Sequence, residues 1–243
     1  MAAPRAPAET YPPYPSYDEL LAAQQWVRPA LNSGQLLFWT LDGPLTSAVS
    51  VMPSPSTPDR PLEPYYNQAS DNWHPVAWLP ITEPKVSSIT VHVYQLEEWE
   101  SAWCDQHWEH TDPDSEEDMQ DGVEWTILEL HDGTTEPDLL RCCGTMRPRG
   151  KNFSVMAKPT VHGEEGFVTV HDFLTVVHPW LIGLKTEILA AKGTLEGHDQ
   201  SLSNQTELMV NSDGLESLMI ERKDEWIDFK RRNPVRVIKI SAS

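Results

Sequence analysis

Apolar positions are spaced most regularly over residues 166–190, which begin with GFVTVHDFLTVVHPWL. They recur with the period of one helical face, at 170, 173, 174, 177, 181, 184 and 188. Thr169 is a favoured N-cap residue, and Asp172 stands three residues later, where a carboxylate can accept hydrogen bonds from free backbone N–H groups. Pro179 removes one helical hydrogen bond. The pattern predicts a helix kinked at Pro179, or two helices end to end, with Gly193 as the stop.

Short apolar runs predict strands elsewhere. QLLFWTL (35–41) is typical of a short buried strand, and VSSITVHVYQL (86–96) alternates, with Ile89, Val91 and Val93 on one face. EWTILELH (124–131) indicates a strand closed by Asp132-Gly133. Two runs, LLRCCGTM (139–146) and NFSVMAK (152–158), flank RPRGK and predict a hairpin.

The two ends of the chain carry weaker signals. A Pro/Ala-rich tail (1–15) is predicted to be disordered. Ser16 and Glu19 form a capping box, which predicts a helix over about 17–27. The Pro-rich segment 52–68 is expected to be a surface loop, and a helix from about 213 and a strand VRVIKI are expected at the C-terminal end.

Strands mixed with one strong helix, without regular strand–helix alternation, indicate the α+β class. We expect an antiparallel or mixed sheet packed against one long helix. Fifteen of the 21 prolines lie in the first 84 residues, so this N-terminal region should be poor in long elements. We expect a single domain over 16–243, with an acidic insert (97–122) and a linker (193–206).

Charge is segregated along the chain. Residues 86–140 contain sixteen Asp or Glu and neither Lys nor Arg, whereas 141–158 contain five basic residues and no acidic one. The formal net charge of −19 disfavours nucleic acid and anionic membrane surfaces as partners. Two interpretations remain open: an acidic segment neutralised by basic residues of the same fold, or a docking surface for a basic partner.

Leu96, Trp99 and Trp103 follow one another at helical spacing within this acidic region. Such a stripe is typical of core packing, although a Trp can also anchor a partner. We expect Trp99 to pack inside. The residues expected to contact a partner are Trp103, Trp108, Asp112, Asp114, Glu116 and Glu117.

One run has the ligand spacing of half a zinc site: Cys104, His107, His110 and Asp112. Closure needs further ligands, and Cys142 with Cys143 would have to supply them through space. Adjacent residues rarely direct both side chains to one metal without backbone distortion. The sequence therefore predicts no metal and no cofactor.

His171, Asp172 and His178 are the remaining candidates for chemistry. The histidines are seven residues apart and so share one side of a helix, but the HExxH pattern is absent, as are the nucleophile elbow and the phosphate-binding loops. We interpret Asp172 as a cap and both histidines as residues that border the core. The alternative is an enzyme or small-molecule-binding protein with a pocket near His171 and His178.

Four segments resemble, in their order, the DUF6699 type of fungal domain: LLFWTLDGPLTSA (36–48), EPKVSSITV (83–91), EWTILEL (124–130) and GFVTVHDFLTVVHPWL (166–181). The resemblance implies a fungal source and a small α+β fold, and it implies no activity. The insert 97–122 and the region 132–165 are longer than the family pattern, so the sheet order stays open.

Three cysteines and a start without an apolar stretch are typical of a cytoplasmic protein, and a nuclear one fits equally. Together these observations predict a non-catalytic intracellular interaction module, which docks a basic partner through an acidic, Trp-containing insert.

Overall fold

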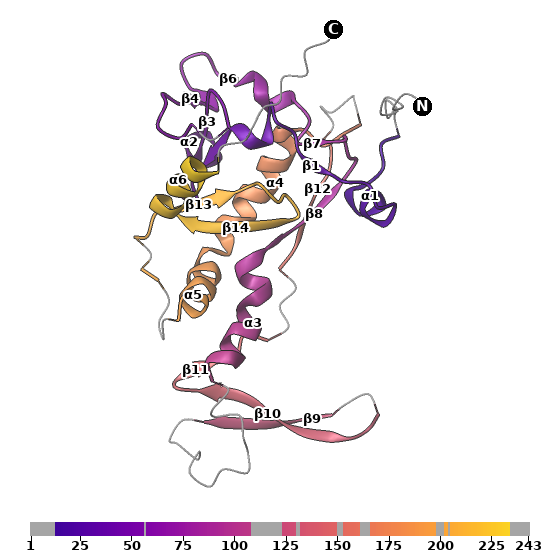
Figure 1. Ribbon diagram of the computed structural model, residues 1–243, viewed down its shortest axis with the longest axis vertical. Coiled ribbons are helices and arrows are strands. Elements are labelled where there is room, and N and C mark those ends of the chain that lie inside the picture. Colours follow the sequence, from indigo (N-terminus) through magenta and orange to yellow (C-terminus); the bar gives the residue numbers. More distant parts are fainter. Residues whose placement is uncertain are drawn as a thin grey trace. The chain divides into compact units, whose positions relative to one another are not determined.

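The computed structural model describes residues 13–55, 57–107, 123–129, 132–149, 153–160, 166–197, 202–203 and 205–233. The chain divides into two compact units, where the sequence predicted one domain. Unit 1 comprises Met1–Val93, Ser154–Lys185 and Gln205–Ser243, and unit 2 comprises Tyr94–Phe153 and Thr186–Asn204. The combination of helices with antiparallel and mixed sheets confirms the α+β class (Figure 1).

A four-stranded mixed sheet lies at the centre of unit 1. Its strands are β12 (Val155–Ala157), β8 (Ile89–Val93), β14 (Ser217–Arg222) and β13 (Leu208–Asn211), in that order. β8 pairs parallel to β14, and the other two pairings are antiparallel. Ile89, Val91 and Val93 are all buried, which confirms the alternation expected for this strand.

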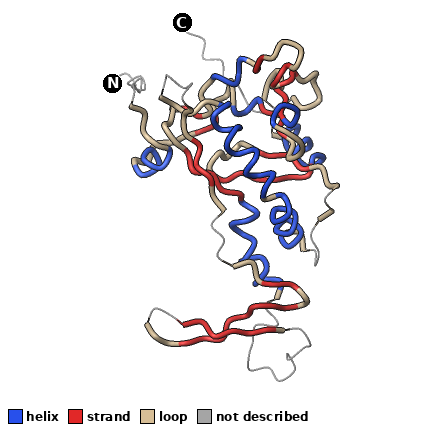
Figure 2. The backbone as a smooth tube through the Cα atoms, turned by 180° about the vertical axis from the view of Figure 1, so that it is seen from behind, coloured by secondary structure: helices blue, strands red, loops and turns tan. Residues whose placement is uncertain are grey.

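The amphipathic segment forms two helices, α4 (Val170–Gly183) and α5 (Lys185–Leu195). The capping box of Thr169 and Asp172 is confirmed, and α4 continues through Pro179. In two opposite views α4 lies against one face of the central sheet (Figures 1 and 2). The predicted stop at Gly193 is wrong. Gly193 is buried within α5, and the positive φ of 74° that suits a glycine after a helix occurs at Gly197.

The rest of unit 1 before β8 consists of short elements, in keeping with its prolines. The capping box of α1 (Tyr17–Ala22) is confirmed, but the helix is shorter than predicted, because Ala23 caps it and Gln24 has a φ of 56°. The elements that follow are β1 (Arg28–Pro29), η1 (Gly34–Leu36), β2 (Leu37–Trp39), α2 (Leu45–Ala48), β3 (Val49–Val51), β4 (Glu63–Pro64), β5 (Tyr66–Asn67), β6 (Asn72–Trp73), η2 (Pro75–Trp78) and β7 (Thr82–Glu83).

These short strands form three small antiparallel sheets, β2-β3-β4, β1-β7 and β5-β6. The strand predicted over 35–41 is present but shorter: β2 covers Leu37–Trp39, and Gln35 and Leu36 belong to η1. The segment 52–68 is more than a surface loop, because it contains β4 and β5 and the fully buried Tyr65.

Unit 1 closes with α6 (Lys223–Arg232). The helix predicted from about 213 begins ten residues later, because Ser217–Arg222 forms β14. Trp226 of α6 packs with Met52 and Met209 in a buried cluster and meets Phe38 edge to face. The strand predicted at 235–240 and the tail 1–12 lie outside the described residues.

Unit 2 contains α3 (Tyr94–Gln106), a three-stranded antiparallel sheet and most of α5. The sheet consists of β11 (Thr145–Met146), β10 (Thr135–Cys142) and β9 (Glu124–Glu129), in that order. The hairpin predicted between 139–146 and 152–158 is wrong. The chain reverses after β10 at Cys143-Gly144, so β10 pairs with β11. β12 pairs with β8 of unit 1.

Among the described residues, no single helix is both long enough and apolar enough to cross a membrane. α4 and α5 reach that length and composition only together, across a bend.

Candidate functional site

His178 uses both ring nitrogens to hold the core of unit 1. Its Nδ1 accepts a hydrogen bond from the indole N–H of Trp39 at 3.0 Å, so its Nε2 carries the proton and donates to the carbonyl of Gly43 at 2.9 Å. The His178 side chain is buried and Trp39 is fully buried. Burial lowers the pKa of His178, and the bond to the Gly43 carbonyl offsets only part of that change.

This arrangement predicts a loss of stability in mild acid. A lowered folded pKa means that the unfolded chain takes up the proton first. The contribution of His178 is therefore present above its usual pKa of about 6.5 and is lost as the pH falls toward the lowered value. We expect the free energy of unfolding to fall by up to about 1.4 kcal/mol per pH unit from this group.

The measurement is urea unfolding at about pH 7.5 and about pH 5.5, on either side of that usual pKa. His178→Gln keeps a donor and an acceptor but does not titrate, so the difference between the two pH values should shrink. His92→Gln, at a partly exposed position on β8, is the control. An unchanged difference in His178→Gln would show that this imidazole is not the group that titrates.

His171 has different neighbours from His178. Its ring packs against Trp73 and Trp78, with centroid separations of 4.6 and 5.1 Å, and its Nδ1 lies 3.4 Å from the hydroxyl of Tyr65. These contacts are those of an imidazole packed among aromatic rings. None of these contacts involves Trp39 or Gly43, the residues that His178 bonds, although the sequence placed the two histidines on one side of a helix.

Asp172 is a buried cap with four hydrogen bonds. One oxygen accepts from the backbone N–H and hydroxyl of Thr160, at 2.9 and 2.7 Å, and the other from the same two groups of Thr169, at 3.0 and 2.6 Å. Burial alone would raise the pKa of this carboxyl, but these bonds outweigh burial and lower the pKa. Asp172 thus fastens the segment before α4 to the start of the helix.

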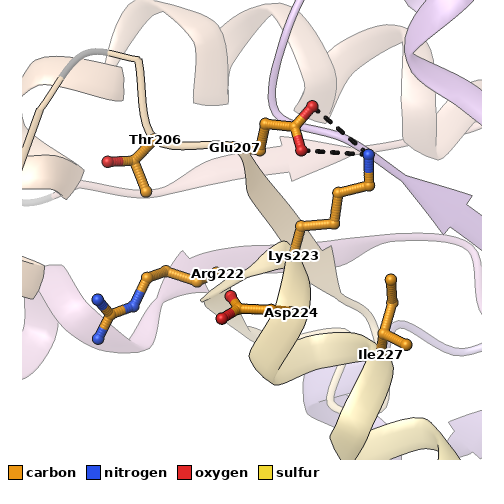
Figure 3. Close-up of a pocket in the computed structure, with 6 residues that line it drawn as sticks. All are labelled: Thr206, Glu207, Arg222, Lys223, Asp224 and Ile227. Atoms are coloured by element: carbon orange, nitrogen blue, oxygen red, sulfur yellow. Dashed lines mark hydrogen bonds and ion pairs between the residues drawn. The ribbon is translucent and has the colours of Figure 1, made fainter.

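A cavity of about 390 Å³ opens on unit 1, away from both histidines. Three of its charged groups are engaged: Lys223 approaches the two carboxylate oxygens of Glu207 at 3.2 and 3.4 Å (Figure 3), and Arg222 bonds Glu225 at 3.0 Å. The cavity is lined by Thr206, Glu207, Arg222, Lys223, Asp224 and Ile227. It gives no support to a pocket built around His171 or His178.

In unit 2 the structure buries Trp103, which was expected to contact a partner. Trp103 is 3 % exposed, packs with Leu139 and Cys142, and donates its indole N–H to Thr145 Oγ1 at 2.9 Å. Trp99 is half-buried and donates to Thr194 Oγ1. Trp103 is therefore a core residue of unit 2, and the expectation that it lies on an exposed docking surface is wrong. Stripe spacing alone could not tell which tryptophan faces the sheet. The other expected contact residues lie outside the described residues: Trp108, Asp112, Asp114, Glu116 and Glu117.

The sheet of unit 2 is covered over only part of one face. Residues opposite each other on paired strands project to the same face, so Trp125 lies beside Leu139, and Ile127 beside Pro137. Leu139 is buried against Trp103, whereas Trp125 is 36 % exposed and Ile127 is 75 % exposed. We call the exposed end of this face, Trp125, Ile127 and Pro137, the β9 face.

β9 is also an open edge. Among the described residues, β9 pairs with β10 and with no second strand, so its outer N–H and C=O groups have no partner strand. Exposed edges of this kind pair readily with an added strand. The apolar pattern of EWTILELH predicted a strand but not the β9 face, because a sequence pattern does not show which face of a strand another element covers.

Acidic and basic residues of unit 2 neutralise each other in part. Arg147 bonds Glu100 and Asp138, and Arg149 also bonds Asp138. These pairs support self-neutralisation for the basic segment that follows β10. Glu129 is exposed on the same side of the sheet as Trp125 and Ile127, and Glu136 is exposed on the opposite side. None of the ion pairs among the described residues involves either of them. Acidic charge is thus left over beside the β9 face.

Cys104, Cys142 and Cys143, all among the described residues, form no disulfide bond. Cys142 is buried, and burial, followed by its contact with Cys143, raises its pKa to about 11, which is the opposite of what a nucleophilic cysteine needs. Cys104 borders the Trp103 cluster, and burial also raises its pKa. Of the ligand-like run, His110 and Asp112 lie outside the described residues, while His107 comes close to Cys142 and Cys143.

Comparison of the chain with models of known protein families, with curated proteins and with solved structures finds no match in any of the three. The resemblance to the DUF6699 type therefore stays a prediction.

Proposed function

We propose that the protein is a non-catalytic interaction module whose unit 2 docks a basic partner. The observation that carries this proposal is the β9 face: an exposed Trp and Ile on an open edge strand, beside acidic side chains that no ion pair among the described residues engages. The tryptophan of the docking surface is then Trp125, while Trp103 supports it from the core.

The chemistry of the occupant follows from the edge and the charge. An extended segment can add to β9 by main-chain hydrogen bonds and place alternate apolar side chains on Ile127 and Trp125. Its remaining side chains should be basic, because Glu129 lies on the same side of the sheet as Ile127, and Glu136 is exposed nearby on the opposite side. A second copy of the chain fits less well, since each copy has a formal net charge of −19 and repels the other.

Replacing Ile127 with serine should weaken binding of an extended basic peptide at least about fivefold, the loss expected when about 1 kcal/mol of apolar contact is removed. The probe is a fluorescent peptide in which lysine alternates with valine, and the measurement is fluorescence anisotropy with the full chain. Met146→Ser is the matched control. Met146 is 59 % exposed on β11 and lies opposite Arg141, which pairs with Glu124 on the other face of the sheet.

The same titration at two salt concentrations tests the electrostatic part. The Debye length shrinks from ~30 Å at 0.01 M to ~3 Å at 1 M ionic strength, so affinity should fall as salt rises. A matched peptide with glutamate in place of lysine should not bind. Equal affinity of Ile127→Ser and Met146→Ser, or an affinity that salt leaves unchanged, would contradict docking at the β9 face.

A further inference from the structure

Three ligand-bearing side chains of unit 2 converge at one point. They come from His107, directly after α3, from Cys142 at the end of β10, and from Cys143 in the turn to β11. One ring nitrogen of His107 and the two Sγ atoms all lie within 4.8 Å of one another. This convergence joins residues about 35 positions apart in sequence, which local backbone geometry alone does not bring together.

The spacing of the two thiols matches that of two ligands on one tetrahedral ion. Zn–S bonds of ~2.3 Å at tetrahedral angles put the sulfur atoms about 3.8 Å apart. The observed Sγ–Sγ distance between Cys142 and Cys143 is 3.7 Å. Cys143 and Gly144 form the two-residue turn between β10 and β11, with φ of 49° and 79°, and this turn lets two adjacent cysteines face one point.

His107 is held as a metal-binding imidazole is. Its Nδ1 lies 2.7 Å from the carbonyl oxygen of Trp103, which can only accept, so Nδ1 carries the proton and Nε2 keeps a lone pair. The ring stacks on the Trp103 indole, with centroids 4.2 Å apart. An Nδ1–H bond to a backbone carbonyl is a common way in which proteins fix the tautomer and orientation of a ligating histidine.

We propose that unit 2 binds one zinc ion through His107, Cys142 and Cys143. Two thiolates and an imidazole are ligands that zinc prefers, and water or a further side chain completes the tetrahedron. The ion ties the end of α3, which carries Trp103, to the β10–β11 turn, next to the β10 and β11 residues that Trp103 contacts. This site is independent of docking at the β9 face, so either proposal can fail without the other.

The test uses the full chain, purified under reducing conditions and freed of metal. Titration with Co²⁺ should give a near-ultraviolet thiolate charge-transfer band and the intense visible bands of tetrahedral cobalt, saturating at one equivalent. Zinc should then displace the cobalt and abolish the colour. Cys142→Ser, Cys143→Ser and His107→Ala should each weaken zinc at least about tenfold, the smallest loss expected even for an outer-shell change.

Cys104→Ser is the matched control, because Cys104 borders the same cluster but is outside the converging group. It should bind as the unaltered chain does. Alkylation mapped by mass spectrometry gives a second readout that does not depend on a ligand variant folding. Zinc should protect Cys143, which is exposed, and leave the reactivity of Cys104 unchanged. No saturable cobalt spectrum, equal loss in Cys104→Ser, or alkylation of Cys143 unaffected by zinc would overturn the proposal.

Discussion

Phe173→Ala should lower the free energy of unfolding of unit 1 by about 3–5 kcal/mol, the usual cost of truncating a fully buried aromatic residue. Phe173 has no exposed surface, and its ring meets Trp39 at 6.3 Å with an interplanar angle of 77°. The truncation removes apolar burial and leaves a void between α4 and β2, because a close-packed interior closes such gaps only in part.

Urea unfolding followed by circular dichroism and tryptophan fluorescence measures this loss. Val176→Ala is the control on the same helix. Val176 is only partly buried, so removing its two methyl groups should cost less than a third as much. Equal losses at the two positions would mean that α4 does not bury the face that carries Phe173.

Asp172→Ala should cost about 2–4 kcal/mol, more than the roughly 0.5–2 kcal/mol of an ordinary cap. An ordinary cap bonds its own helix end, whereas Asp172 also accepts from the backbone and hydroxyl of Thr160. Thr169 is buried, and its backbone N–H and hydroxyl both donate to Asp172, so the substitution removes the acceptor of two buried donors. Asp172→Asn should cost less, because its amide oxygen still accepts while its NH₂ cannot.

The pH dependence of Asp172 has the same sign as that of His178, but it lies in a lower pH range. The folded pKa of Asp172 is lowered, so its contribution is present above the usual carboxyl pKa of about 3.9 and is lost as the pH falls through the lowered value. Urea unfolding of Asp172→Ala and of the unaltered chain should converge in strong acid. Unchanged stability of Asp172→Ala at neutral pH would contradict the structural role assigned here.

The sequence predicted the helix starts and the strand that depend on residues close together in the chain. The capping boxes at Ser16 and Thr169 marked the starts of α1 and α4, because capping side chains bond backbone groups within three residues. The alternation of Ile89, Val91 and Val93 identified β8, because apolar residues at every second position are typical of a strand with one buried face.

Other features depended on partners that lie far along the chain. LLRCCGTM and NFSVMAK were predicted to pair with each other because they are neighbours in the sequence. Closeness in sequence does not exclude pairing with a distant strand, and β12 pairs with β8 instead. The segment 213–222 was predicted to begin a helix, but Ser217–Arg222 forms β14, in which Leu218 and Ile220 are buried at alternate positions. The helix begins only at Lys223, because pairing with β8 and β13 decides the structure of this segment.

The candidate site was predictable only as a region. Charge segregation pointed to unit 2, but burial decided that Trp103 is core and that Trp125 is exposed. The spacing of Cys104 and His107 suggested half a metal site. In the structure, the cysteines that converge with His107 are Cys142 and Cys143. Which of several nearby ligands converge depends on how α3 packs on β10, and the sequence does not specify that packing.

Hydrogen–deuterium exchange of the full chain, with and without the lysine–valine peptide, tests docking by the β9 face most directly. We predict new protection of backbone amides over 124–129 and 135–139, as expected when a strand is added to an open edge, and no change around α4. Protection that appeared instead over 166–181, beside His171 and His178, would contradict this account and would favour a binding site on unit 1.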